Sequence, residues 1–486
     1  MLEKTLQGNT DRLYEMFGKP ADLYEKELEL CAVKCKIVLY EDLSSLEKLW
    51  NMLLMSVNND PRRFSGAEEL YDFLLKGSGL PFMPKPAQSY EELRNYLTAG
   101  FSVLFLEGIG RALVFATQEK TYRSVQEPSG EGNLRGSREG FIEPLRQNMG
   151  LIRRRIRGEE LRMETMILGS QTKTEVGLFY MEGSASPQLV EGVKKKLEQI
   201  QMPMLMEAEY LAPFLEKRPL SFFTGVGYTE RPDTLCAKIC EGKIAVMVDG
   251  SPFAMILPML FTEHFQSMDD YASRPYFASF IRILKYAAFF VSVLFPGLFV
   301  AALNFAPQVI PKQLLYTIAS AEQQTPLPLF LEAILITFML EVIREAGLRL
   351  PKPIGHSVSL VAALIIGDAA VKAGILSSPM IIVSAITAIS TFVVPSLYEP
   401  ITVLRVLFIL AGGIFGPMGV TLLMAVTIFN ICAIDTMGVP YMAPITPYDL
   451  SLMRDGVVRV GWRRLARRSF VISDLPGAHP KEGSHD

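Results

Sequence analysis

Residues 283–303 read ILKYAAFFVSVLFPGLFVAAL, an apolar stretch whose single charged residue is Lys285. A helix needs about 20 predominantly apolar residues to cross the roughly 30 Å of hydrocarbon in a bilayer. This stretch meets that requirement, and the residues before it are mixed and charged. The sequence therefore predicts a soluble region followed by a membrane part.

Further apolar stretches follow it. Three more candidate spans are residues 327–345, 354–373 and 380–397. The long run 401–435 is interrupted by Gly412, Gly413 and Gly416-Pro417, which favours a hairpin of two short spans. Residues 309–320 lie between prolines and are too short to cross, so we expect an interfacial or re-entrant segment there. Residues 281–436 are thus predicted to form an all-α multi-pass transmembrane bundle of four to six helices.

The charges at the two ends of these stretches predict the orientation. The first forty residues lack the apolar core of a signal peptide, so we expect the amino-terminal region to stay in the cytoplasm. Six crossings then place the basic residues near Arg344, near Arg405 and in the tail 437–486 on the cytoplasmic side, and four crossings also return the tail inside.

The region before the bundle is predicted to be α/β, in two subdomains. The turn-rich stretch 126–137 separates residues 1–127 from residues 136–280. Alternating apolar residues and turn signals predict these elements: strand 31–40, helices 43–55, 67–76 and 90–98, strands in 101–116, helix 138–157, strands 164–168 and 174–180, a helix from Ser186 to about Ile200, and a hairpin over 243–257.

Composition excludes several classes of function. The balance of 48 basic against 51 acidic residues gives no field that would attract nucleic acid. Five cysteines in 486 residues indicate free thiols in a reducing compartment. Cys31 and Cys35 are predicted to share a strand face, and Cys236 and Cys240 a helix face, which would allow a four-thiolate zinc site. Nothing in the sequence brings the two pairs together, so we expect no metal. No phosphate-binding loop or nucleophile motif is present, and we expect neither a cofactor nor an enzyme.

Ionisable residues inside the apolar stretches are candidate pore or gating residues, because burying a charge at the bilayer centre costs about 2.5–3.5 kcal/mol. Glu332, Glu341 and Asp368 are the candidates, and we expect them to face other helices or water. Glu341 and Glu345 also allow a structural interpretation, in which they pair with Arg344 or Arg349 near the membrane interface. Asp368 has only Lys372 as an obvious local partner.

Hydroxyl residues at helical spacing form a second candidate. Ser384, Thr387 and Thr391 fall on one helix face, where they could line a polar path or make hydrogen bonds between helices. The run Arg153, Arg154, Arg155 could bind phosphate or headgroups, although such a run is more often a solvated or salt-bridged face.

Several strings go beyond composition. In chain order they are RGSREGF at 135–141, LIRRRI at 151–156, TERPD at 229–233, EGKIAVMVDGSPF at 241–253, REAGLRLPKPIG at 344–355 and PYMAP at 440–444. Together they resemble the signatures of the GerA family of spore germination proteins. The matching residues are Arg138, Glu139, Arg153, Arg154, Arg155, Glu230, Arg231, Asp249, Gly250, Arg344, Glu345, Arg349, Pro351, Pro353 and Gly355.

The resemblance implies an A-type subunit in the inner membrane of the spore. Such subunits work with a transporter-like B subunit and a lipoprotein C subunit in nutrient-triggered germination, and are thought to form homo-oligomeric gated ion channels in membrane lipid. A paralogous branch, stage V sporulation protein AF, shares this architecture. His356 and Asp368 depart from the glutamine that the family commonly carries there. Rival hypotheses are a substrate transporter, which predicts inverted repeats, and a non-conducting scaffold.

Overall fold

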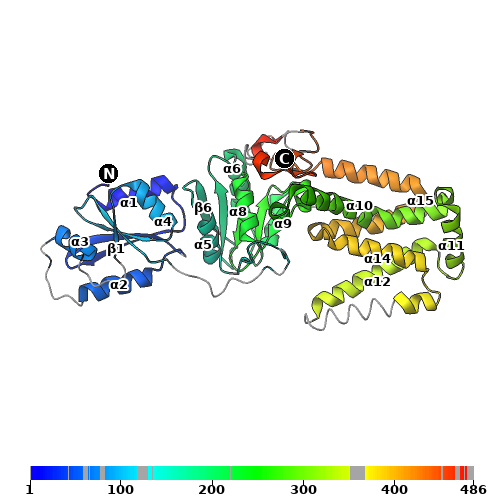
Figure 1. Cartoon of the computed structure of the whole chain (residues 1–486), viewed down its shortest axis with the longest axis horizontal. Helices are drawn as coiled ribbons and strands as arrows, with labels where there is room; N and C mark the ends of the chain where they lie inside the picture. Colours follow the sequence, from blue (N-terminus) through cyan, green and yellow to red (C-terminus); the bar gives the residue numbers. More distant parts are fainter. Residues whose placement is uncertain are drawn as a thin grey trace.

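The computed structural model describes residues 2–41, 43–58, 64, 66–76, 83–118, 128, 130–133, 135–218, 221–350, 367–449, 453–465, 471–475 and 477–478. Two α/β domains and a body of helices follow one another along the long axis of the molecule (Figure 1). The segment after the last long helix returns to the second domain, so the helices are held at both of their chain ends.

The first domain is an antiparallel sheet covered by helices on both faces. Its strand order is β1-β2-β4-β5-β3. The strands are β1 Leu23–Leu30, β2 Val33–Tyr40, β3 Lys85–Ala87, β4 Ser102–Leu106 and β5 Ala112–Phe115, and the helices are α1 Leu6–Phe17, α2 Leu46–Asn58, α3 Ala67–Lys76 and α4 Tyr90–Thr98. Because side chains alternate along β2, Ile37 packs with α2 and α3 on one face, and Val38 packs with α1 and α4 on the other.

Most predicted elements of this domain are confirmed, including both ends of α3 and α4. The sequence did not predict α1 or β1. β1 reads LYEKELEL and is an edge strand, so its charged residues stay exposed and hide the apolar alternation. Cys31 lies in the turn between β1 and β2 with a φ of 51°, and not on the strand with Cys35.

The second domain repeats this plan with the strand order β6-β7-β9-β10-β8. Its elements are α5 Leu145–Arg155, β6 Leu161–Leu168, β7 Thr174–Met181, α6 Pro187–Glu198, α7 Ala212–Leu215, β8 Gly227–Thr229, α8 Pro232–Cys240, β9 Ile244–Val248 and β10 Ala254–Leu257. Helices α6 and α7 cover one face, and α5 and α8 cover the other. The predicted hairpin over 243–257 is confirmed as β9 and β10, which pair antiparallel.

The predicted helix 138–157 is wrong in its first turns, because α5 begins only at Leu145. Pro144 stands at the N-cap. The preceding loop is fixed instead by Asn148, whose side chain accepts a hydrogen bond from the Ile142 amide at 3.0 Å. These local bonds replace the helical bonds that the residues before Pro144 would need.

Arg153 joins the two domains. Its guanidinium donates two hydrogen bonds to the Asp22 carboxylate, both of 3.1 Å, and the two side chains are 1% and 3% exposed. The guanidinium also lies 4.7 Å from the centre of the Tyr40 ring. Arg154 and Arg155 both pair with Glu139. The salt-bridged interpretation of the arginine run is therefore confirmed.

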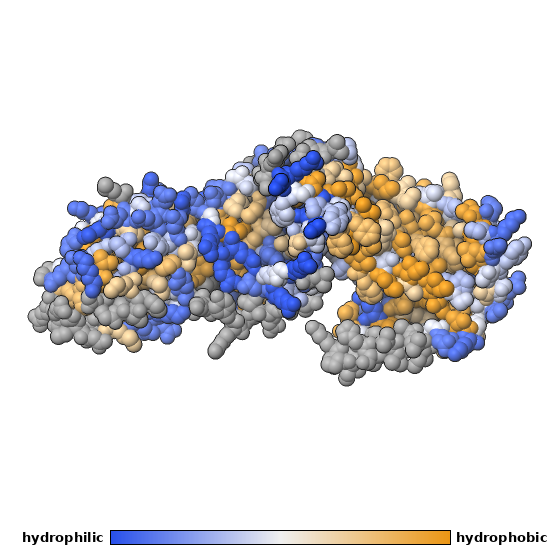
Figure 2. Space-filling model, viewed as in Figure 1, coloured by the Kyte–Doolittle hydropathy of each residue, from blue (hydrophilic) through white to orange (hydrophobic). Residues whose placement is uncertain are grey.

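The helical part contains α10 Pro275–Phe305, α11 Lys312–Glu322, α12 Leu329–Arg349, α14 Ser378–Phe392 and α15 Tyr398–Cys432. Within the described residues, the stretches Pro275–Phe305 and Pro395–Cys432 are long and apolar enough to cross a membrane. Figure 2 shows apolar residues over much of the visible surface of this part, whereas the two domains are largely hydrophilic. Most of the predicted span 354–373 lies outside the described residues, as do Pro351, Pro353, Gly355 and His356.

Helix α15 turns back on itself at Gly416, where φ is 60° and ψ is −149°. An added Cβ at Gly419 would lie 2.5 Å from the Ala411 carbonyl oxygen, a contact that a straight helix cannot make across eight residues. Ile401 and Ile431, near the two ends of α15, share one apolar cluster. The predicted hairpin at Gly416-Pro417 is therefore confirmed in its shape, as a first arm before Gly416 and a second arm after it.

Candidate functional site

The hydroxyl face of α14 points into the helical body. Ser384, Thr387 and Thr391 are buried, at 4%, 1% and 3% exposure. Thr387 and Thr391 donate to carbonyl oxygens of their own helix one turn back, at 2.7 Å and 2.9 Å. The predicted common face is confirmed, and Thr391 keeps lone pairs free to accept another hydrogen bond.

Arg405 makes that bond. It is 4% exposed and donates to Thr391 on α14 and, at 3.0 Å, to the carbonyl oxygen of Ser292 on α10. Helix α15, which carries Arg405, approaches α10 closely, because an added Cβ on Gly412 would lie 2.3 Å from the Gly297 carbonyl oxygen. One guanidinium thus connects α10, α14 and α15. In the part of the chain that the structure describes, Arg405 has no carboxylate in ion-pair distance.

Arg405 lies within a helix, inside the apolar run predicted over 401–435, and its place on the cytoplasmic side stays a prediction. Helix α15 begins at Tyr398, so Arg405 is carried about two turns into the helix. Loop charge counts cannot separate a loop arginine from one just inside a span. The small residues that let α10 approach α15 were the one sequence signal for the burial of Arg405.

Glu341 joins the end of α12 to the start of α15. It accepts hydrogen bonds from the Tyr398 hydroxyl and from Arg344, the latter at 3.0 Å. The Arg344 guanidinium lies 3.9 Å from the centre of the Tyr398 ring. Glu345 pairs with Arg349 at 2.7 Å. The local pairing predicted for these acids is confirmed.

The other two candidate acids differ in burial. Glu332 is completely buried, and one of its oxygens accepts a hydrogen bond from the Ser377 amide at 3.0 Å. Asp368 pairs with Lys372 at 2.6 Å, as predicted, but its side chain is 60% exposed. Within the described residues Asp368 is not packed against other helices and does not share the buried interior of Ser384, Thr387 and Thr391, so that it faces water stays a prediction.

A charged junction, formed by Asp270, Tyr271, Arg282 and Asp455, connects the helices to the soluble part. Helix α9, Met268–Ala272, ends the second domain and carries Asp270. Arg282 on α10 is fully buried and donates to Asp270 at 2.7 Å and to the Asp455 carboxylate at 2.8 Å. Tyr271 donates to Asp455 at 2.6 Å. The junction therefore holds the second domain, α10 and the carboxy-terminal segment together.

A second buried charge cluster lies beside this junction. Glu263 accepts hydrogen bonds from Lys238, at 2.7 Å, and from Lys243. Burial would raise the pKa of Glu263, but the two lysine charges lower it to about 2. Burial also lowers the pKa of Lys243, to about 8. The cluster fixes the short helical turn Phe261–Phe265 against β9.

His264 in this turn contacts the helical part. Its Nδ1 lies 3.1 Å from the Ser396 hydroxyl, just before α15, and its Nε2 is buried without a hydrogen-bond partner in the described residues. Burial lowers the pKa of His264 to about 4, although the Glu263 charge opposes the shift. The imidazole is therefore neutral at pH 7.

We expect acid to weaken the folded state through His264. Between pH 4 and the ordinary value of about 6.5, the unfolded chain binds more protons than the folded chain, so stability rises with pH across that window. The expected loss on acidification from pH 6.5 to 4 is about 3 kcal/mol, from 1.36 kcal/mol per pKa unit. Unfolding of the full chain in detergent at pH 6.5 and pH 4 measures it.

The variant His264→Gln should lose this part of the acid sensitivity, whereas His479→Gln should keep it. Glu263 contributes separately, because stability from its depressed pKa is present above about pH 4.5 and is lost as pH falls toward 2. An unchanged pH profile in His264→Gln would exclude the histidine as its source.

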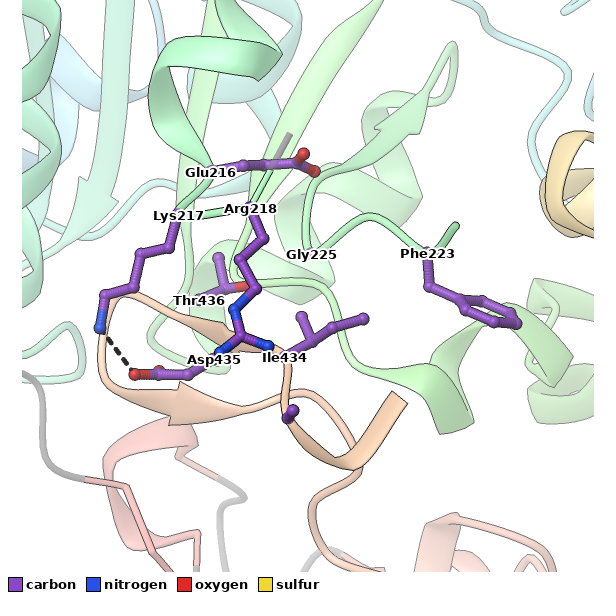
Figure 3. Close-up of a pocket in the computed structure, with 9 residues that line it drawn as sticks. Glu216, Lys217, Arg218, Phe223, Gly225, Ile434, Asp435 and Thr436 are labelled. Atoms are coloured by element: carbon purple, nitrogen blue, oxygen red, sulfur yellow. Dashed lines mark hydrogen bonds and ion pairs between the residues drawn. The ribbon is translucent and has the colours of Figure 1, made fainter. Parts of the chain in front are cut away.

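A cavity of about 200 Å³ lies between the second domain and the segment after α15 (Figure 3). Lys217 crosses its edge to pair with Asp435 at 2.8 Å. Close by, the Ser221 hydroxyl donates to the Asn430 side chain at 3.0 Å in the last turn of α15. The sequence did not single out these residues. They give the second domain another contact with α15.

The family-signature residues frame the second domain. Arg231 pairs with Asp233 at 2.6 Å and donates to the carbonyl oxygen of Ser137 at 3.0 Å, which joins the TERPD and RGSREGF strings. The Phe141 amide donates to the Glu230 carbonyl oxygen at 2.7 Å. Asp249 accepts from the Leu145 amide at 2.9 Å, and Gly250 supplies the φ of 95° in its turn. Arg138 is exposed in the loop before α5.

The described residues contain no group of three or more His, Cys, Asp or Glu side chains that could hold a metal ion. Cys236 lies in the core of the second domain and Cys35 in that of the first. The two cysteine pairs therefore lie in different domains.

These features define a class of protein in which two α/β domains are joined by buried ion pairs to an apolar helical body. The model of the family Bacillus/Clostridium GerA spore germination protein matches residues 11–470. The chain belongs to this family of spore germination proteins.

The relatives and solved structures that are similar to the chain include the following three. Spore germination protein KA of Bacillus subtilis (strain 168) is 39% identical over 80% of this chain and 72% of its own length. The uncharacterized membrane protein YfkQ of the same strain is 37% identical over 79% and 75%. The crystal structure of the N-terminal domain of the A subunit of the Bacillus megaterium spore germinant receptor GerK3 has 26% identity and a TM-score of 0.41, and the match covers 54% of this chain and 97% of that domain.

Proposed function

We propose that this chain is the A-type membrane subunit of a nutrient germinant receptor, and that an oligomer of it forms a gated path for ions. The single observation that carries the proposal is Arg405, a buried guanidinium that connects three apolar helices. The proposed partners are a transporter-like B subunit and a lipoprotein C subunit. No catalytic step and no cofactor is assigned.

The physical reason lies in the cost of the charge. A guanidinium in an apolar interior is expensive, and charged groups within apolar spans mark ion paths and gates. Arg405 has a carbonyl oxygen and a hydroxyl as partners. Among the described residues no acid lies within ion-pair distance of this charge, and Glu341 acts on it only from farther away. A simple packing role would be served better by an apolar side chain of the same volume.

The charged junction supplies the coupling in this proposal. Arg282 fixes the start of α10 to Asp270 of the second domain. Farther along α10, Gly297 meets Gly412 of the first arm of α15, about two helix turns beyond Arg405. A movement of the second domain would therefore shift α10 against the helix that carries Arg405.

The proposed setting is the inner membrane of the spore, with the two α/β domains in the cytoplasm. The end of α12 with Arg344 and Arg349, and the segment after α15, both lie toward the soluble domains (Figure 1). Basic residues on that side agree with the positive-inside rule. The short helix α11 lies at the opposite end of the helices.

Release of potassium from spores after nutrient addition tests the proposal. A strain that lacks the chain should release potassium more slowly than the parent, and the wild-type chain should restore the rate. The variant Asp368→Ala tests the exposed acid in the same strain. Normal release without the chain would contradict a required role and would favour the sporulation paralog or a scaffold.

A further inference from the structure

The end of the helical body that is farthest from the soluble domains contains a buried carboxylate that is only half satisfied. Glu332, on α12, is 0% exposed. Its Oε2 accepts a hydrogen bond from the amide of Ser377, the N-cap residue of α14, at 3.0 Å. Its Oε1 is buried with no hydrogen-bond partner in the described residues. An acid held in this way has an open ligand position.

Two further oxygens share this deficiency. The Oγ of Ser377, which is 2% exposed, and one carboxylate oxygen of Glu322 on α11 are also buried without partners in the described part of the chain. Burial raises the pKa of Glu322, and the nearby charge of Glu332 raises it further. Glu322 lies on the same side as Ser377, because the turn after α11 contacts the turn before α14: an added Cβ on Gly374 would lie 2.9 Å from the Gln324 carbonyl oxygen.

The apolar surroundings make it costly to leave these oxygens without hydrogen-bond partners. Leu329, Ala333, Leu376 and Met380 form the apolar cluster around Glu332. No lysine or arginine of the described residues pairs with Glu332 or Glu322, and the nearest basic residue in sequence to α14, Lys372, is paired with Asp368. Uncompensated ions in such a medium cost several kcal/mol each. A positive charge at this point would remove most of that cost.

We propose that Glu332, Glu322 and Ser377 bind a hard metal cation that has lost part of its water shell. Carboxylate and hydroxyl oxygens are the ligands that such cations prefer. The inference deepens the proposed function, on which it rests, because it places an ion site on the path at the end away from the soluble domains. The site is distinct from Arg405, whose charge lies deeper in the same body.

Thermal unfolding of the purified full chain in detergent tests the site. Chloride salts of potassium, sodium, magnesium and calcium are titrated at constant ionic strength, with choline chloride as the cation that cannot enter. For the wild type we expect a saturable rise in Tm with at least one metal cation and none with choline. Glu332→Gln should lose that rise, and Asp368→Asn, which changes an exposed acid, should keep it.

Ser377→Ala provides a second variant, which removes one ligand and leaves both charges in place. We expect it to need several-fold more cation for half of the Tm rise. The proposal is overturned if no metal cation exceeds choline, or if Glu332→Gln keeps the rise. It is also overturned if Tm changes with pH but not with any metal cation, since the two acids would then share a proton.

Failure of the site and failure of the proposed function give different results. A cation-dependent Tm rise in a chain that conducts no ions would support the cation site and contradict the proposed channel. Ion conduction by a chain that shows no such rise would support the channel and contradict the cation site.

Discussion

Replacing Arg282 with Met is expected to lower the free energy of unfolding by about 3–5 kcal/mol, the cost of leaving one partner of a buried ion pair uncompensated. Asp270 is 3% exposed and would keep only Lys285, at 3.9 Å, as a counter-charge. The measurement is denaturant unfolding of the full chain in detergent. Arg274→Met is the matched control, because Arg274 is exposed at the N-cap of α10 and should change stability by less than about 0.5 kcal/mol.

A double variant separates charge from packing. In Asp270→Leu with Arg282→Met no buried charge is left alone at the Asp270 position, and Asp455 is 26% exposed and can be hydrated. We therefore expect the double variant to be more stable than Arg282→Met alone. If the single variant unfolds like the wild type, the charged junction does not hold the two parts together.

Replacing Arg405 with Gln is expected to raise the basal flux of potassium about tenfold or more. The change removes a positive charge that opposes cations inside the helical body, and 1.4 kcal/mol of barrier corresponds to a factor of ten. It also weakens the bonds to Ser292 and Thr391 that hold three helices together. The measurement is potassium efflux from liposomes that contain the purified chain.

Arg405→Lys distinguishes the two causes. Lysine keeps the charge but not the planar fork that reaches two acceptors. A low flux in Arg405→Lys and a high flux in Arg405→Gln would assign the barrier to charge, whereas a high flux in both would assign it to the lost bonds between helices. Equal flux in all three proteins would show that Arg405 is a packing residue.

The order of the two α/β domains and the helical part was predictable because each has its own pattern of apolar residues along the sequence. The helices α3 and α4 carry an apolar face with polar ends, and Asp249-Gly250 marks a turn whatever surrounds it. The turn at Gly416 was predictable for the same local reason. β1 was not, because an edge strand with alternating charges is stabilised by its pairing with β2 and not by its own composition.

The candidate site was predictable only in part, because burial in a helical body depends on where each helix begins. Glu332 and Asp368 look alike in sequence, and yet one is fully buried and the other is exposed. Arg405 and Arg282 were hidden for another reason. Their partners, at Thr391 and at Asp270 and Asp455, come from separate elements that only the tertiary fold brings together.

Potassium efflux from liposomes containing only the purified chain tests most directly whether the helices of this protein form an ion path. We expect a wild-type flux above that of protein-free liposomes and a larger flux in Arg405→Gln. Both proteins must first be shown by protease protection to be inserted with the α/β domains on one side. Flux no greater than that of protein-free liposomes, for the inserted wild type and for the inserted variant, would contradict the claim that these helices form an ion path.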